Sequence, residues 1–395
     1  MIRFRPLSMV PIALYACAKP DPTPTWTGEV APIIADHCAI CHRDGGVAPY
    51  AFTDYTQAVA LAASMPSVLQ SGFMPPWRAD ASCRSYADDL ALSADDQATI
   101  IGWATGGTPL GDGVDSAEPG AYGITSIDAI LALTTPWTPV ETPDEERCFL
   151  FPYEGGDGFV TGLWADPGDP QEVELVRAFV VAPADLGPWE ALDDTDPADG
   201  WSCGGDPGGN ALPTTWLGTW TPGEKHGDFP AGTGIPIAAG SKVGVQIHYH
   251  VATGRPDSFA MELSLASTVE HRASWVTVAD PTWPAGITVP AGSTGAAFTY
   301  EDVVSSAVTV YAAEPVERDF GTAATLDSSA GCLVDVPAWD PDWQRAYAFS
   351  TPQSLAAGDT VDVTCTYANP GATDVLGGDG PGQETCRGML YATTN

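Results

Sequence analysis

Apolar residues recur at helical spacing in the first quarter of the chain. Residues 30–39, 58–69 and 95–104 each place apolar side chains three or four positions apart, a pattern that predicts helices. Ser93 is a typical residue for the start of the last helix, because its hydroxyl can accept a backbone hydrogen bond. Residues 26–112 are therefore expected to form a small all-α domain.

From residue 146 to the end, the pattern changes to short apolar runs separated by turns rich in Gly, Pro and Asp. Many short runs of this kind predict antiparallel strands packed as sandwiches. Because about 250 residues are rather long for one sandwich, we expect two all-β sandwiches, at 146–262 and 263–395. Residues 113–145 are expected to be a linker that holds one helix at 124–133. The clearest strand candidates are 159–164, 172–182, 242–251, 307–312 and 360–367.

The N-terminal segment has the pattern of an export signal. Two arginines precede a short apolar run at 9–16, which is far below the ~20 residues that span a bilayer. The run ends in Leu-Tyr-Ala-Cys at 14–17, which resembles the lipobox of bacterial lipoproteins. This resemblance implies a signal peptide at 1–17 and a lipid on Cys17, with the Pro-rich residues 18–25 as a tether; an ordinary secretory leader with a chance cysteine is the alternative. We expect an exported, membrane-anchored lipoprotein of the periplasm or cell surface.

Charge removes one class of partner. The chain has 51 acidic and 15 basic residues, a net charge of -36. Such a surface repels phosphate backbones, so nucleic acid is excluded as a partner. The simplest interpretation of the acidity is a solvated surface suited to a salty environment.

Cys38-Ala39-Ile40-Cys41-His42 is the pattern at which two thiols form thioethers with haem and the histidine ligates the iron. The alternative is a redox-active or zinc-binding Cys-x-x-Cys pair. Zinc would need two further ligands, for which only His37 and Cys83 are near. We therefore expect haem c on Cys38, Cys41 and His42.

Two methionines are candidates for the second ligand of the haem iron. Met65 lies within a predicted helix, whereas Met74 lies in Gly-Phe-Met-Pro-Pro-Trp at 72–77, where two prolines stiffen the backbone. We expect Met74. Methionine opposite histidine suits electron transfer rather than oxygen activation, which implies a redox partner protein.

Four motifs in the helical region stand at 37–42, 45–49, 74–77 and 92–93. On these motifs, residues 26–112 resemble the cytochrome c domain of many exported bacterial proteins.

A second set of motifs follows in the strand region, at 147–149, 160–162, 167–170, 230–234, 246–250, 332–340, 343–344, 365–369 and 384–386. On these, residues 146–395 resemble the copper type II, ascorbate-dependent monooxygenases, the family of peptidylglycine and dopamine hydroxylases, in a form fused to a cytochrome. This second resemblance implies two jelly-roll-like sandwiches that face each other across a cleft able to take a small molecule or a peptide.

The nine cysteines leave an even number once lipid and haem are assigned. Six cysteines suit a disulfide framework in an oxidising compartment, although they allow fifteen connectivities. The monooxygenase family has a disulfide at a spacing like that of Cys365 and Cys386, and Cys148 with Cys203 is the second pair expected. Cys83 and Cys332 stay unassigned.

The copper ligands of the family are mostly missing from this chain. By alignment, the His-His pair falls on 174–175, the His-x-His pair on 316–318 and the methionine on Thr385, so that only His248 remains. Imidazole and thioether donors are what let a site hold and cycle copper. Only four histidines follow residue 42, and both sites together need five, so copper is expected to be absent or limited to one ion.

A residual metal site is the remaining metal hypothesis. His248 and His250 alternate on a predicted strand and so share a face, and His226 lies on an upstream loop. These three could bind one metal ion, whereas histidines that only form hydrogen bonds are the ordinary interpretation.

Three functions follow from these residues. The first is a haem c electron-transfer lipoprotein whose monooxygenase-like module has lost copper catalysis. The second is an active monooxygenase that uses one non-standard metal site fed by the cytochrome. The third is a ligand-binding or adhesive surface protein. Whether the chain is an enzyme is left open.

Overall fold

The computed structural model describes residues 23–394, except 142, 205–214, 252–253, 280–282, 379 and 381. The predicted signal peptide, its Cys17 and most of the predicted tether lie outside the described residues. Within the described part, no helix has the length and apolar character needed to cross a membrane.

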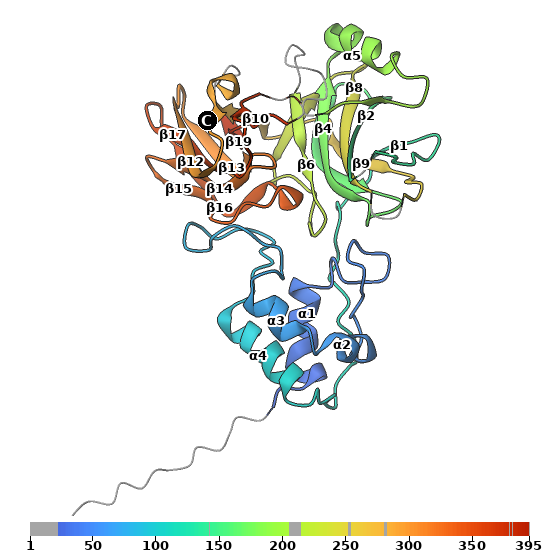
Figure 1. The fold of residues 1–395 in the computed structure, drawn as a ribbon. Helices are drawn as coiled ribbons and strands as arrows, with labels where there is room; N and C mark the ends of the chain where they lie inside the picture. Colours follow the sequence, from blue (N-terminus) through green and yellow to red (C-terminus); the bar gives the residue numbers. More distant parts are fainter. Residues whose placement is uncertain are drawn as a thin grey trace, which may run out of the picture.

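Short helices occupy residues 26–105 and lie below the sheets in Figure 1. Trp26, Ile34 and Trp103 are buried where these helices meet. Ser93 caps the last helix as predicted, since its Oγ accepts the backbone N–H of Asp96 at 3.0 Å. The elements are η1 (Trp26–Val30), α1 (Ala31–His37), α2 (Tyr55–Leu61), α3 (Met65–Gln70) and α4 (Ala94–Thr105).

Most of the remaining chain is β-sheet. A five-stranded sheet has the order β5 (Trp201–Ser202), β2 (Asp144–Pro152), β8 (Lys242–His250), β4 (Val173–Val181), β6 (Thr215–Trp220). An eight-stranded sheet has the order β1 (Ala129–Ala132), β9 (Ala260–Ala266), β3 (Gly158–Asp166), β7 (Thr233–Ile237), β10 (His271–Val278), β19 (Arg387–Thr394), β13 (Val308–Val316), β16 (Tyr347–Leu355). A four-stranded sheet has the order β12 (Ser293–Val303), β17 (Thr360–Asn369), β14 (Gly321–Ser328), β15 (Gly331–Val336).

Smaller elements complete the sheet region. β11 (Thr288–Val289) pairs with β18 (Val375–Leu376). One further α-helix, α5 (Leu186–Asp193), lies at the top of the five-stranded sheet in Figure 1. The short helices are η2 (Pro183–Asp185), η3 (Pro284–Gly286) and η4 (Pro341–Trp343).

The strands form where the sequence pattern predicts them. All five of the clearest candidate runs are strands, namely β3, β4, β8, β13 and β17. In β17 every second residue is buried, because successive side chains of a strand point to opposite faces. Its inward-facing side chains are Val361, Val363, Cys365, Tyr367 and Asn369.

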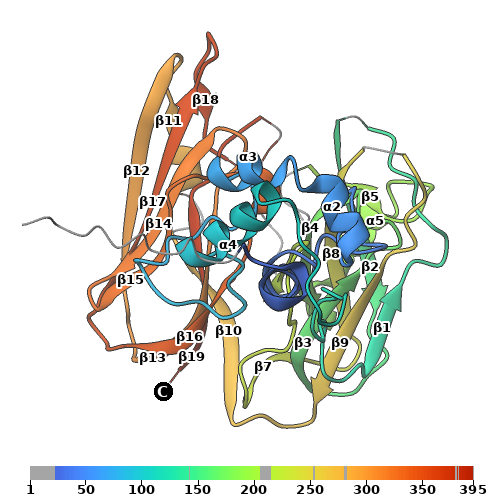
Figure 2. The same ribbon diagram turned by 90° about the horizontal axis from the view of Figure 1, so that it is seen from below.

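The eight-stranded sheet belongs to both halves of the molecule. Its first four strands pack against the five-stranded sheet, and its last four pack against the four-stranded sheet, with a hydrophobic core in each half. The halves are joined where β7 and β10 pair in parallel, with Thr233 opposite His271. We call the two halves the first and the second sandwich; Figure 2 shows them side by side, with the short helices in front of the space between them.

The expected fold class is therefore wrong. The chain is predominantly β, and its helices are few and short, the longest being the 12 residues of α4. Residues 77–90 contain no helix, and their apolar side chains enter the second sandwich, where Ala79 and Tyr86 are buried in its core. Because the sheet buries this segment, the helices do not form a self-contained all-α domain. The two sandwiches are also not separate, since one sheet continues through both.

The predicted linker contains a strand rather than a helix. β1 pairs along β9 at the edge of the eight-stranded sheet, with Leu131 buried against the first sandwich core. A short apolar run does not distinguish a helix from a strand by itself. The neighbouring sheet edge decides in favour of the strand.

Three disulfides link the described chain. Cys365 pairs with Cys386 and Cys148 with Cys203, the two pairs that were expected. The third pair, which the sequence left open, joins Cys83 to Cys332 across 249 positions. Disulfides persist in oxidising compartments, so the protein functions outside the cytoplasm.

Candidate functional site

An apolar cavity of about 440 Å³ opens among the short helices. Residues of the predicted haem attachment pattern form part of its wall: Cys38, Cys41 and His42. Both candidate methionines, Met65 and Met74, are in the same wall. We call this space the helix cavity. Its other lining residues are Ile34, His37, Val47, Ala48, Pro49, Tyr50, Phe52, Leu61, Ser64, Val68, Leu69, Phe73, Pro75, Pro76, Leu90, Ile100 and Trp343.

The two cysteines of the attachment pattern are free thiols. Among the cysteines that the structure describes, only Cys38 and Cys41 are outside a disulfide. Burial raises the pKa of Cys38 to about 12 and that of Cys41 to about 11, so both are neutral at pH 7. They therefore line the helix cavity as uncharged groups.

The ring of His42 is held in one orientation. Its Nδ1–H donates to the carbonyl of Tyr50 at 2.8 Å, and the ring packs on Phe52 with centroids 4.3 Å apart. A backbone carbonyl can only accept, so this bond leaves Nε2 as the nitrogen available to a metal. Burial lowers the pKa of His42, which favours the neutral imidazole that a metal binds.

The zinc alternative loses one of its further ligands in this structure, because Cys83 is in a disulfide with Cys332. Nδ1 of His37 is within hydrogen-bonding distance of the Leu90 carbonyl, at 3.2 Å, which still leaves Nε2 of that ring for a metal. A closed zinc site needs four ligands, so it could not be completed by the pair His37 and Cys83.

A second cavity, of about 370 Å³, lies between the two sandwiches, and we call it the inter-sandwich cleft. Its walls come from β2, β4, β6 and β8 on one side and from β10, β13, β19 and η4 on the other. His248 lines it together with every segment on which the alignment placed a lost copper ligand. Those positions are Glu174, Val316, Glu317, Arg318 and Thr385.

Arginines gather at the buried end of this cleft. Arg177 is only 9% exposed, and Arg318 and Arg387 line the same cavity from the second sandwich. One guanidinium nitrogen of Arg177 donates to Oε1 of Gln344 at 3.0 Å. Burial lowers the pKa of Arg177, and the positive charges of Arg318 and Arg387 lower it further. The negative charges of Glu314 and Glu146 act in the opposite direction and raise this pKa. Like charges are therefore held near one another in a poorly solvated place.

Several buried polar atoms in the cleft have no hydrogen-bond partner within the described part of the chain. They are Nε of Arg177, Nε1 of Trp216, Oε2 of Glu317, Oγ1 of Thr385 and Nε2 of His248. Burial raises the pKa of Glu317 to about 9 and lowers that of His248 to about 4, so both are neutral at pH 7. An unpartnered buried polar group costs free energy unless a ligand or water satisfies it.

Carboxylates gather at the exposed end of the cleft. Asp144, Glu174 and His250 each place one ligand atom within 4.8 Å of the others. His250 lies 3.0 Å from Asp144 and 3.5 Å from Glu174, and the bond to Asp144 raises the pKa of His250. Burial and nearby Asp342 raise the pKa of Glu174 to about 7.

The three histidines of the predicted residual site do not come together. His248 and His250 share a face of β8, opposite Glu146 and Asp144 of β2, as strand alternation predicts. His226 instead binds Asp88 at 2.8 Å and lines a separate cavity on the side of the short helices. The loop that carries His226 leads away from the inter-sandwich cleft.

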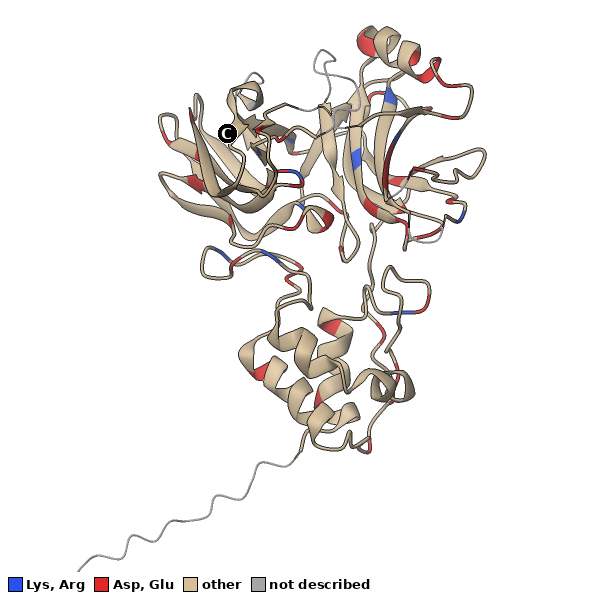
Figure 3. Ribbon diagram, in the orientation of Figure 1, with Lys and Arg blue, Asp and Glu red and all other residues tan. Residues whose placement is uncertain are grey.

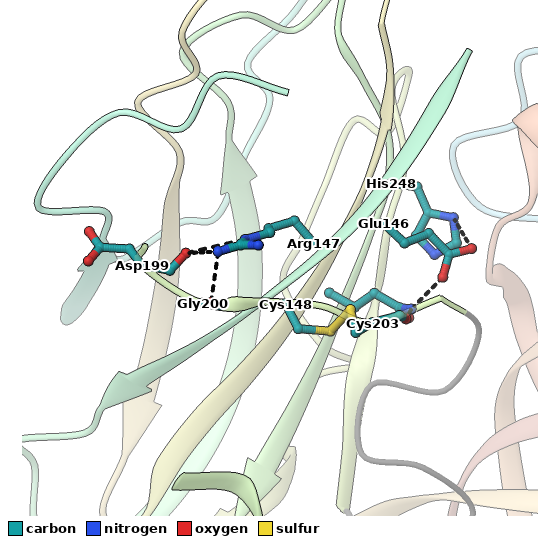
Figure 4. Close-up of a disulfide and its surroundings, with 8 residues drawn as sticks. Glu146, Arg147, Cys148, Asp199, Gly200, Cys203 and His248 are labelled. Carbon is teal, nitrogen blue, oxygen red and sulfur yellow. Dashed lines mark hydrogen bonds and ion pairs between the residues drawn. A yellow bond between two sulfur atoms is a disulfide. The ribbon is translucent and has the colours of Figure 1, made fainter. Parts of the chain in front are cut away.

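The disulfide of β2 holds one wall of the cleft in place. In Figure 4, Cys148 joins the Cys203 segment, and Arg147 donates to the carbonyls of Asp199 and Gly200, both at 2.7 Å. The neighbouring Glu146 points to the other side of the strand, where its Oε1 lies 3.8 Å from Nδ1 of His248. One side of β2 is therefore fixed by the disulfide and by Arg147, and the other side faces the cleft.

One short segment of the second sandwich reaches both cavities. Asp342 and Gln344 line the inter-sandwich cleft, whereas Trp343 between them lines the helix cavity. At the start of this segment, Asp340 binds Arg78 at 2.7 Å. Neighbouring residues of one short segment therefore contribute to the walls of both cavities.

Sequence reasoning missed Arg177, Asp342 and Trp343. Arg177 had a detectable signal, because it interrupts an otherwise apolar strand and buried charges are rare unless they serve a purpose. Asp342 and Trp343 had none, since only the packing of η4 against β4 brings them to the cavities.

The comparisons with known proteins leave the family open. No protein-family model matches the chain, and no curated protein sequence matches it. A structure of peptide-N(4)-(N-acetyl-β-D-glucosaminyl)asparagine amidase is similar at 11% identity and a TM-score of 0.31, over 68% of this chain and 96% of that one. PNGase F, a glycosylasparaginase from Flavobacterium meningosepticum, has 10% identity and a TM-score of 0.31 over the same shares. The VP2 subviral particle of infectious bursal disease virus has 10% identity and a TM-score of 0.17, over 68% of this chain and 71% of that one. Similarities this weak carry no argument about function.

Proposed function

We propose that this protein binds haem c covalently through Cys38 and Cys41 in the helix cavity and transfers electrons to a partner protein. The supporting observation is that the two unpaired thiols, His42 and Met74 line one apolar cavity. A cavity of a few hundred Å³ with apolar walls and few polar groups suits a large apolar cofactor.

Each of these residues would hold the haem group in a different way. Cys38 and Cys41 would form the thioethers, and His42 would bind the iron through Nε2, with its ring fixed by the Tyr50 carbonyl. Met74 is the proposed opposite ligand, and Met65, buried in the same wall, is its competitor. Bound haem supplies one reversible electron, and a methionine ligand raises its potential. The apolar wall excludes water, which suits electron transfer.

The inter-sandwich cleft supports the proposed loss of copper catalysis. The aligned ligand positions carry side chains that cannot replace imidazole and thioether donors: Glu174, Leu175, Val316, Arg318 and Thr385. We also propose that Cys17 carries a lipid that anchors the exported protein to a membrane.

Metal content and mass of the mature protein test this function. We expect one iron per chain, a haem c spectrum that survives denaturation, and no firmly held copper after dialysis against copper and a mild chelator. Cys41→Ser should leave haem attached by the single thioether of Cys38, so it should survive denaturation; Cys38→Ser with Cys41→Ser should abolish covalent haem, because neither thioether can form. Ser67 is an exposed residue of α3, so Ser67→Ala serves as the control. A haem-free mature chain would refute the haem assignment, and a stoichiometric copper ion would favour the monooxygenase alternative.

A further inference from the structure

We propose that the inter-sandwich cleft binds a small amino-carboxylate, a molecule with an oxyanion at one end and an ammonium group at the other. Buried Arg177, with partly buried Arg318 and Arg387 beside it, would take the oxyanion. The carboxylates at the more exposed end would take the ammonium group. This inference stands on the cleft alone and does not depend on haem.

The buried end of the cleft combines clustered arginines with two donors that lack an acceptor in the described chain. The chain has 15 basic residues against 51 acidic ones, so Lys and Arg are sparse in Figure 3, yet Arg177, Arg318 and Arg387 line this one cavity. Nε of Arg177 and Nε1 of Trp216 are buried donors with no acceptor in the described chain, and the guanidinium lies 5.8 Å from the Trp216 ring centroid. Buried N–H groups of this kind are normally satisfied, so an acceptor is missing.

Local carboxylates cancel this positive charge only in part. Oε1 of Glu146 lies 3.6 Å from a guanidinium nitrogen of Arg318 and pairs with it directly. Glu314 is the buried acid beside Arg177, and both of its oxygens accept from Oγ1 of Thr219. Burial raises the pKa of Glu314 to about 7, so it is only partly ionised near neutral pH. A planar oxyanion can accept two parallel hydrogen bonds from a guanidinium, which suits carboxylate or phosphate.

The exposed end of the cleft has the opposite charge. Asp144 and Asp342 are exposed, Glu174 is half-buried, and all three line the same cavity. His250 satisfies Asp144 and Glu174 only in part, because Asp342 still raises the pKa of Glu174 by repulsion. A cation at this end would relieve that repulsion. Opposite charges at the two ends therefore select a molecule that carries both.

A series of ω-amino acids tests the proposal by isothermal titration calorimetry on the full mature protein. The probes are glycine, 4-aminobutyrate and 6-aminohexanoate, with acetate and butylamine as single-ended controls. We expect saturable binding of at least one amino acid, tighter than both single-ended compounds, with the best length set by the separation of the two ends. Equal affinity for acetate or butylamine, or no saturable binding at all, would overturn the proposal.

Variants separate the two ends of the cleft. Arg177→Met should weaken binding by on the order of tenfold or more, because it removes a buried charge partner. Arg387→Met is the second variant in case the buried Arg177 is needed for folding. Asp342→Asn should weaken binding by about threefold, because the site is exposed. The matched controls Arg272→Met and Glu301→Gln, both on exposed faces away from the cleft, should bind as the wild type does.

Haem content, measured on the same samples by absorption, keeps this test independent of the proposed function. A chain without haem that still binds an amino acid would refute only the electron-transfer proposal. A chain with haem in which the arginine variants bind as tightly as the wild type would refute only the amino-carboxylate site.

Discussion

Replacing both Cys83 and Cys332 by alanine tests how the segment that closes the helix cavity is held on the second sandwich. Met74, Pro75 and Pro76 line that cavity, and the chain then crosses to the sheets. There Tyr86 is buried in the second sandwich core and its hydroxyl donates to the carbonyl of Leu333 at 3.4 Å. The disulfide is the one covalent link between this segment and the sandwich in the described chain.

The expected loss of stability follows from the length of chain that the disulfide closes. Its cysteines are 249 positions apart, and the Cys148–Cys203 disulfide shortens the path by 55. Closing about 200 residues reduces the entropy of the unfolded chain by an amount that stabilises the fold by about 5 kcal/mol. Since domains are stable by only about 5–15 kcal/mol, most of the margin of the second sandwich should go.

Urea unfolding followed by near-ultraviolet circular dichroism measures the effect. We expect the midpoint of the second sandwich transition to fall strongly in the double variant, with the wild type in the same non-reducing buffer as the reference. A change equivalent to less than about 1 kcal/mol would contradict the loop-entropy argument. It would mean that burial of Tyr86 and its neighbours holds the segment without the disulfide.

Three further predictions concern single residues. Arg147→Met should cost about 3 kcal/mol in urea unfolding, because it removes a buried cation bound to Asp196 and to two carbonyls; a cost below about 0.5 kcal/mol would contradict this. Burial raises the folded pKa of Glu317 to about 9 from an ordinary value near 4.5, so its contribution to stability falls as pH rises between those values. Glu317→Gln cannot ionise, so its advantage over the wild type in urea midpoint should grow from about pH 5 to about pH 9, and a constant difference would refute the shift. Gly223 has a φ of +88°, and a Cβ there would lie 3.1 Å from Sγ of Cys41; Gly223→Ala should cost about 1 kcal/mol and lower haem content. Gly292→Ala, with a φ of +70° and open space around it, should cost the same without losing haem; equal haem loss in both would show that contact with Cys41 is irrelevant.

Features that depend on neighbours along the chain could be predicted from the amino-acid order. A short apolar run predicted β17, and strand alternation placed His248 and His250 on one side of β8. Ser93 predicted the start of α4, since an N-cap bond joins residues three positions apart. The even cysteine count predicted a disulfide framework in an oxidising compartment.

The surfaces that cover these elements depend on the complete fold. The apolar spacing of residues 26–112 predicted helices correctly in part, yet a sheet rather than another helix buries Tyr86, which is why the all-α expectation was wrong. Residues 124–133 became partly strand because the edge of β9 was free to pair with them. Burial depends on the partner that chain topology supplies, and local periodicity carries no information about that partner.

The candidate sites also contain some features that neighbouring residues predict and others that only the fold produces. Cys38, Cys41 and His42 are adjacent in sequence, so their spacing alone predicted the group that lines the helix cavity. The inter-sandwich cleft joins Arg177 to Arg387 and Asp342 to Glu174, which lie far apart in the chain. His226 shows the converse, because it lies near His248 in sequence but its loop leads to another cavity. Which of these residues share a cavity depends on how β4, β13, β19 and η4 pack across the cleft, and that packing depends on the whole fold.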